Sequence, residues 1–175
     1  MSGVVRSMTH FDWVWLSTDA QVTTVIEAYR RASWVTRLIG RYDLPNDSSH
    51  ARGVFTPWAR IPLIFVAQGS LAVDERAVTF NPRVHRVFGW RMHGVRSELS
   101  FHYPTAELVG VEPADKQSPV AHFFDIPFTR IRTVHAPPLD NFLLCVGGRF
   151  AIPRIRRRSL ELRKELLNLV VKPAV

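Results

Sequence analysis

Arginines recur along one segment of the chain, Asn81–Arg96, at spacings that place several of them on one side of a strand. Arg83, Arg86, Arg91 and Arg96 alternate there with apolar residues. Because the side chains of a strand point to its two faces in turn, this pattern separates cations from apolar groups. Guanidinium groups bind phosphate and carboxylate through paired hydrogen bonds. The segment is therefore predicted to be an anion-facing stripe, with an ordinary solvated strand face as the alternative.

A second group of arginines, Arg154, Arg156, Arg157 and Arg158, lies where the last helix is expected to begin. The positive end of a helix dipole disfavours cations at that place, whereas an anion bound among them would also meet the free N–H groups of the helix. Compensation by a carboxylate such as Glu161 is the alternative. Arg154 and Arg157 are predicted to bind an anionic partner, together with the four arginines of the first segment.

The residue types needed for catalysis or metal binding form no recognisable motif. Cys145 is the only cysteine, which excludes an internal disulfide and a CxxC metal site. The seven histidines match no metal-ligand spacing, and no GxSxG, GxGxxG, Walker or HExxH pattern occurs. We therefore expect no catalytic residue, no metal, no cofactor and no enzymatic activity. One alternative stays open, in which His93, His102 and His122 converge with Asp125 in an acid–base site.

Composition sets further bounds. The chain has 175 residues, 46% of them hydrophobic, which suits one well-packed domain. Its 23 basic and 15 acidic residues give a net charge of +8, which favours anionic partners. No apolar run approaches the roughly eighteen residues of a spanning helix, and no secretory signal is visible. The expected location is the cytoplasm, with peripheral attachment to a membrane as a further option.

The N-terminal part, residues 1–53, is predicted to be a helical extension with a linker. Thr18 and Gln21 fit a capping box, and apolar residues follow them at helical spacing. The preceding segment, Phe11–Leu16, has the composition of a short apolar strand or an aromatic clamp. Leu44–Gly53 is dense in turn formers, so we place the linker there.

Residues 54–175 are predicted to form a β domain. Short apolar segments separated by turns favour an all-β barrel or sandwich over parallel βαβ units. The first hairpin is expected to join Leu63–Ala72 to Ala77–Phe80 through a polar turn, Asp74-Glu75-Arg76. Further strands are expected at Val87–His93, Glu98–His102, Glu107–Glu112, His122–Ile126, Phe128–Val134 and Phe142–Gly147.

The end of the chain, Arg154–Val171, is predicted to be an amphipathic helix, because its apolar and charged residues separate at a period of 3.6. The apolar face carries Ile155, Leu162, Leu166, Leu169 and Val170, and the opposite face carries Arg157, Glu161 and Lys164.

A strand meander that opens with such a hairpin and ends in one long helix resembles the pleckstrin-homology-like (PH-like) superfamily, which includes GRAM and bacterial PH-like domains. The resemblance covers about two thirds of the chain, Ile61–Val171. It implies a mainly β (α+β) fold, a bent antiparallel β-barrel closed by the C-terminal α-helix. Phosphoinositide-binding members concentrate cations on the first hairpin, whereas the Asp74-Glu75-Arg76 loop is net negative here, which argues against a specific inositol-phosphate pocket.

The resemblance implies a non-enzymatic binding or adaptor module for a protein partner or an anionic phospholipid surface. Two alternatives stay open. A nucleic-acid-binding protein is favoured by the Arg-rich surface, although no recognisable nucleic-acid-binding module is present. A small-ligand carrier or enzyme would use the barrel interior, with His93, His102 or His122 lining it.

Overall fold

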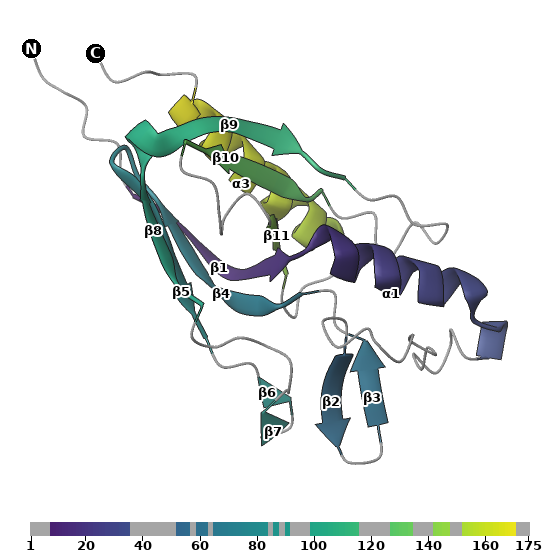
Figure 1. Ribbon diagram of the computed structural model, residues 1–175. Helices are drawn as coiled ribbons and strands as arrows, with labels where there is room; N and C mark the ends of the chain where they lie inside the picture. Colours follow the sequence, from purple (N-terminus) through teal and green to yellow (C-terminus); the bar gives the residue numbers. More distant parts are fainter. Residues whose placement is uncertain are drawn as a thin grey trace, which may run out of the picture.

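Seven antiparallel strands form one curled sheet against which a long C-terminal helix packs (Figure 1). The structure is a computed structural model that describes residues 8–35, 52–56, 59–62, 65–83, 86–87, 90–91, 99–115, 127–134, 142–147 and 152–170. In spatial order the strands are β8 (Phe101–Pro104), β5 (Ala77–Pro82), β4 (Ala67–Val73), β1 (Thr9–Ser17), β11 (Leu143–Val146), β10 (Thr129–Thr133) and β9 (Leu108–Pro113). The helix is α3 (Ile152–Val170). The predicted mainly antiparallel β fold with a C-terminal helix is thereby confirmed.

Strand β1 lies inside this sheet, between β4 and β11, and pairs antiparallel with both. Its apolar residues Phe11, Val14 and Leu16 are buried and belong to the main hydrophobic cluster. The sequence pattern predicts that residues 1–53 form an extension ahead of the β domain. The sheet instead takes strands from both sides of residue 53, and its first strand is β1, not the segment from Leu63.

A bulge interrupts β1 where its register against β4 shifts between Phe11 and Val14. Trp13, within the bulge, has a φ of 63°, a region that bulky side chains rarely enter. Its carbonyl accepts a hydrogen bond of 2.7 Å from the Gly147 N–H, beyond the end of β11. Bulges bend a strand and increase its twist, so this one contributes to the curl of the sheet.

Helix α1 (Asp19–Arg31) follows β1 directly and begins as the sequence predicted. The Thr18 hydroxyl accepts a hydrogen bond of 3.1 Å from the Gln21 N–H, which caps the helix. The buried face of α1 packs against β11 and forms a second hydrophobic cluster, separate from the main one. Its members are Val22, Val25, Ile26, Phe128, Leu143, Cys145 and Ile155. Successive residues of β11 belong in turn to the second cluster and to the main one. Both faces of β11 are thus covered.

The predicted hairpin is confirmed as β4 and β5. Asp74 forms its turn, since one carboxylate oxygen accepts hydrogen bonds from the N–H groups of Arg76 (2.7 Å) and Ala77 (2.8 Å). An Asx turn of this kind closes a loop without glycine. Asp74 of this loop therefore has a structural role.

The two edge strands, β8 and β9, are consecutive in the chain and are joined only by a short 3₁₀ helix, η2 (Thr105–Glu107). The Thr105 N–H donates to the Arg76 carbonyl, and the Val134 N–H donates to the Glu107 carbonyl. Both edges of the sheet are thereby held at one corner. Pro104 ends the edge strand β8, where a missing N–H is tolerated.

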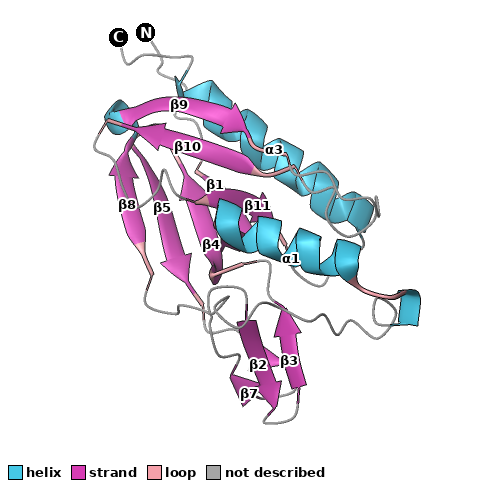
Figure 2. Ribbon diagram, turned by 45° about the vertical axis from the view of Figure 1, so that its right-hand side comes forward, coloured by secondary structure: helices cyan, strands magenta, loops and turns pink. Residues whose placement is uncertain are grey.

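Two small sheets lie outside the main one (Figure 2). One pairs β2 (Arg52–Thr56) with β3 (Ala59–Pro62), and the other pairs β6 (Arg86–Val87) with β7 (Trp90–Arg91). The single strand predicted at Val87–His93 is therefore wrong: two short strands fold back on each other, with Gly89 in the sequence between them. The strand predicted at His122–Ile126 lies outside the described residues.

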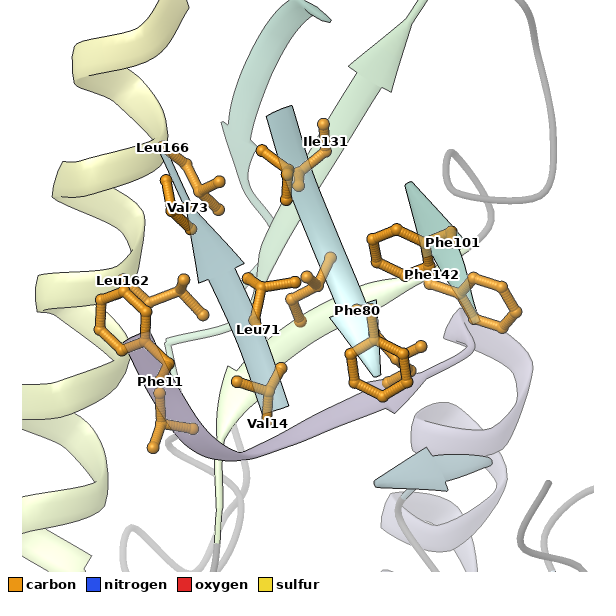
Figure 3. Close-up of a cluster of buried hydrophobic side chains, with 14 of the residues drawn as sticks. Phe11, Val14, Leu71, Val73, Phe80, Phe101, Ile131, Phe142, Leu162 and Leu166 are labelled. Atoms are coloured by element: carbon orange, nitrogen blue, oxygen red, sulfur yellow. The ribbon is translucent and has the colours of Figure 1, made fainter. Parts of the chain in front are cut away.

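The main core lies between the sheet and α3. Figure 3 shows Leu162 and Leu166 of α3 directed at side chains of the sheet, among them Leu71 and Val73 of β4. Both leucines are fully buried, and Leu169 is partly buried against the same cluster, as the apolar stripe of the helix predicted. No helix in the described part of the chain is long and apolar enough to cross a membrane.

Candidate anion-binding surface on helix α3

The packing of α3 decides which of its side chains face outward. Ile155, Ser159, Leu162 and Leu166 recur every three or four residues and are buried against the sheet. Residues on the opposite side of the helix must then face away from the core. The arginines of its first turns accordingly reach the surface.

A hollow of about 650 Å³ lies on this outer side of α3. It is lined by Pro153, Arg154, Arg157, Arg158 and Glu161. Three guanidinium groups thus share the hollow with one carboxylate, and the lining as a whole is positive. We call the surface that Arg154, Arg157 and Arg158 form here the arginine hollow.

The contact within the hollow follows helical spacing. Arg157 donates a hydrogen bond from Nε to Oε1 of Glu161 at 2.9 Å, one turn further along α3. The Arg157 side chain is 81% exposed, so this ion pair adds little to stability and competes weakly with an incoming anion. The compensation by Glu161 that the sequence offered as an alternative is therefore present at Arg157.

The other predicted site residues lie elsewhere. Arg83 follows β5, and its Nη2 lies 3.2 Å from a carboxylate oxygen of Asp12 in β1. Arg86 and Arg91 are register partners in the small β6–β7 sheet. Arg96 lies outside the described residues. Of the six predicted arginines, the structure therefore brings Arg154 and Arg157 together in one hollow, while Arg83 is paired with a carboxylate.

Two further arginines hold elements together and are structural. Arg163 of α3 donates to the Phe128 carbonyl at 2.8 Å and to the Thr129 hydroxyl at 3.2 Å, and it pairs with Asp115. Arg130 of β10 pairs with Asp19 at the start of α1. These contacts join residues far apart in sequence, so no local pattern could have separated these arginines from the anion-binding candidates.

Arg158 was not among the six predicted site residues, although it lines the hollow beside Arg154 and Arg157. It lies one helical turn after Arg154, and Glu161 lies seven residues after Arg154. Residues at these spacings share a helix face. The helical period therefore contained the signal needed to find them.

Reactive groups in the described part of the chain are few. No group of three or more His, Cys, Asp or Glu residues there could hold a metal ion. Burial raises the pKa of the Cys145 thiol far above its ordinary value, which keeps it protonated and unreactive. His102 shares a hydrogen bond of 2.8 Å with the Thr79 hydroxyl on the exposed side of β5 and β8. His93, His122 and Asp125, which the open acid–base alternative needs together with His102, lie outside the described residues.

Comparisons with known proteins give no match: no family model, no curated protein and no solved structure matches the chain. The function must be inferred from the geometry of the chain.

Proposed function

We propose that the protein is a non-enzymatic binding module of PH-like architecture. In this proposal it binds negatively charged groups of a protein partner or of an anionic membrane surface through the arginine hollow of α3. It acts in the cytoplasm, with attachment to membranes that is peripheral.

The order of strands supports the PH-like part of the proposal. Along the chain, each strand of the main sheet neighbours the next, except where η2 turns the chain from one edge to the other. The first strand, β1, pairs with the last, β11, and α3 follows directly after it. A bent meander closed by a terminal helix is the arrangement that the resemblance implies. The segments between β1 and β4 and between β5 and β8 are then insertions into it.

The arginine hollow is the observation that carries the functional part. Guanidinium groups on one rigid helix can donate several charge-assisted hydrogen bonds to phosphate or carboxylate oxygens. Because α3 is fixed to the sheet by Leu162, Leu166 and Arg163, little freedom is lost when an anion binds. The net charge of +8 adds long-range attraction.

Polyaspartate, a chain of carboxylates, provides a defined probe for this proposal. We expect it to bind the wild-type protein, and we expect the triple variant Arg154→Gln/Arg157→Gln/Arg158→Gln to bind about tenfold or more weakly, because charge-assisted hydrogen bonds are lost. Isothermal titration calorimetry at two salt concentrations measures both affinities. Binding should weaken with salt, since exposed charges are screened.

A matched control separates the hollow from net charge. The variant Arg31→Gln/Arg76→Gln/Arg132→Gln also lowers the charge of +8 by three, and it breaks two exposed ion pairs, with Glu27 and Glu112. We expect it to retain most of the affinity. An equal loss in both variants, or no binding by the wild-type protein, would contradict the proposal.

A further inference from the structure

A second face of α3 lies beside the arginine hollow and differs from it in chemistry. Leu160 and Leu167, seven residues apart, are 47% and 40% exposed although both are large and apolar. Arg156 and Lys164 are exposed on the same part of the helix. A hollow of about 420 Å³ there is lined by Pro153, Arg156, Arg157, Leu160, Glu161 and Lys164. We call Arg156, Leu160, Lys164 and Leu167 the leucine stripe.

The helical period explains this grouping. Leu160 and Leu167 are two turns apart and share one line along the helix, while Arg156 and Lys164 are each one turn from Leu160. Apolar side chains with basic residues on either side form an amphipathic surface of the kind that lies in the plane of a membrane. The long stems of Arg and Lys let their charges reach lipid phosphates while their methylenes lie beside the leucines.

We infer that the leucine stripe docks on an anionic lipid bilayer, with Leu160 and Leu167 inserted among the headgroups and Arg156 and Lys164 on the lipid phosphates. This inference rests on the proposed function as an anion-binding module and names the partner. The contact is peripheral, because only one face of a helix that is fixed to the sheet takes part. α3 stays folded on the sheet throughout.

The size of the stripe favours a bilayer over a protein. From Arg156 to Leu167 the helix rises about 16 Å, and a helix is about 10 Å wide, so the stripe covers about 160 Å². A stable protein interface needs about 800 Å² from each partner. A bilayer needs no such area, because each basic residue near an anionic surface strengthens binding about fivefold and each inserted leucine adds to it.

The inference is tested by co-sedimentation with vesicles of phosphatidylcholine alone and of phosphatidylcholine with phosphatidylserine. We expect the wild-type protein to bind only the second kind. The variants Leu160→Ser/Leu167→Ser and Arg156→Glu/Lys164→Glu should each bind about tenfold or more weakly. Thermal unfolding checks that the variants, all at exposed positions, are folded.

Two matched controls carry comparable changes at exposed positions away from α3. Val109→Ser/Val134→Ser removes two apolar residues that are 60% and 61% exposed, and Arg31→Glu/Arg76→Glu changes the net charge as much as the α3 charge variant. Both controls should retain binding. Wild-type protein that ignores phosphatidylserine vesicles, or leucine variants that bind them normally, would overturn the inference.

A position-specific readout completes the test. Leu160→Cys labelled with an environment-sensitive dye should shift its emission to the blue on phosphatidylserine vesicles, because the dye leaves water. The native Cys145 is fully buried and leaves the label on the new thiol. An unchanged spectrum while the protein sediments would place the membrane contact elsewhere and overturn the inference. Polyaspartate binding that depends on the hollow, without any vesicle binding, would overturn only the bilayer inference and leave the proposed function standing.

Discussion

Cys145 illustrates how burial alone removes a reactive group. Its side chain is fully buried with residues of α1, and burial raises the pKa of the thiol far above its ordinary value. The thiol stays protonated in the folded protein, whereas it ionises in the unfolded chain from about pH 9 upward. Its contribution to stability is therefore fully present below that pH and is lost as the pH rises above it.

We predict that the free energy of unfolding falls above about pH 9 more steeply for the wild-type protein than for Cys145→Ala. The difference in slope approaches about 1.4 kcal/mol per pH unit, the value for one proton. Urea denaturation between pH 8 and about pH 10 measures it. Parallel curves, or a thiol that reacts readily with a disulfide reagent in the native state, would contradict the burial of Cys145.

Two glycines of the sheet differ sharply in the space around them. A Cβ on Gly69 of β4 would lie 2.1 Å from the Asn81 carbonyl oxygen and 2.7 Å from Cζ of Phe80. A Cβ on Gly110 of β9 would lie 3.9 Å from its nearest neighbour, in Arg132, which is an ordinary contact. Backbone atoms cannot rotate away as a flexible side chain can, so of these two glycines it is Gly69 whose substitution requires its neighbours to move.

Gly69→Ala is accordingly expected to lower the free energy of unfolding by about 1–3 kcal/mol, the usual range for overpacking. Gly110→Ala, its matched control, should change it by no more than about 0.5 kcal/mol. Urea denaturation of both variants compares them directly. Equal effects would show that β5 does not approach Gly69 as closely as the structure has it.

At the scale of elements, α3 is attached to the sheet by three kinds of contact. Leu162 and Leu166 are buried in the core, and Arg163 donates hydrogen bonds at the start of β10. The buried Ser159 hydroxyl accepts a hydrogen bond of 2.9 Å from the Val146 N–H and lies 3.3 Å from the Val146 carbonyl. Ser159 thus provides hydrogen-bond partners for the backbone N–H and carbonyl at the end of β11, as a neighbouring strand would.

If α3 closes the sheet in this way, Leu166→Ala should cost about 2–5 kcal/mol of unfolding free energy, the range for a buried leucine. Leu160→Ala, on the exposed face of the same helix, controls for helix propensity and should cost no more than about 0.5 kcal/mol. Chemical denaturation distinguishes the two. A Leu166 variant as stable as the Leu160 variant would mean that the core does not extend to α3.

Local pattern predicted some elements and could not predict others. The β4–β5 hairpin and α3 follow from signals within about twenty residues, namely alternation, an Asp-containing turn and a helical period. The place of β1 follows from pairing with β11, more than a hundred residues away. Phe11–Leu16 could therefore be assigned as a strand, but its position in the sheet could not.

At the scale of the whole molecule, some arginines join elements of the fold, and others lie on the surface of α3. Arg130 and Arg163 hold elements together, and Arg83, which follows β5, pairs with Asp12 of β1. Composition counts all arginines alike, so the sequence could not separate these from a binding site. Arg154 and Arg157 were predictable together because they share one helix, whereas the carboxylate that pairs with Arg83 comes from a strand 71 positions earlier.

The central claim is that the arginine hollow is where the protein binds anions. NMR of arginine side-chain N–H groups during titration with polyaspartate tests it most directly, because every arginine is observed at once. We predict that the largest shifts fall on Arg154, Arg157 and Arg158, while the half-buried and paired Arg130 and Arg163 stay unchanged. Shifts spread evenly over the exposed arginines, or centred away from α3, would contradict the claim.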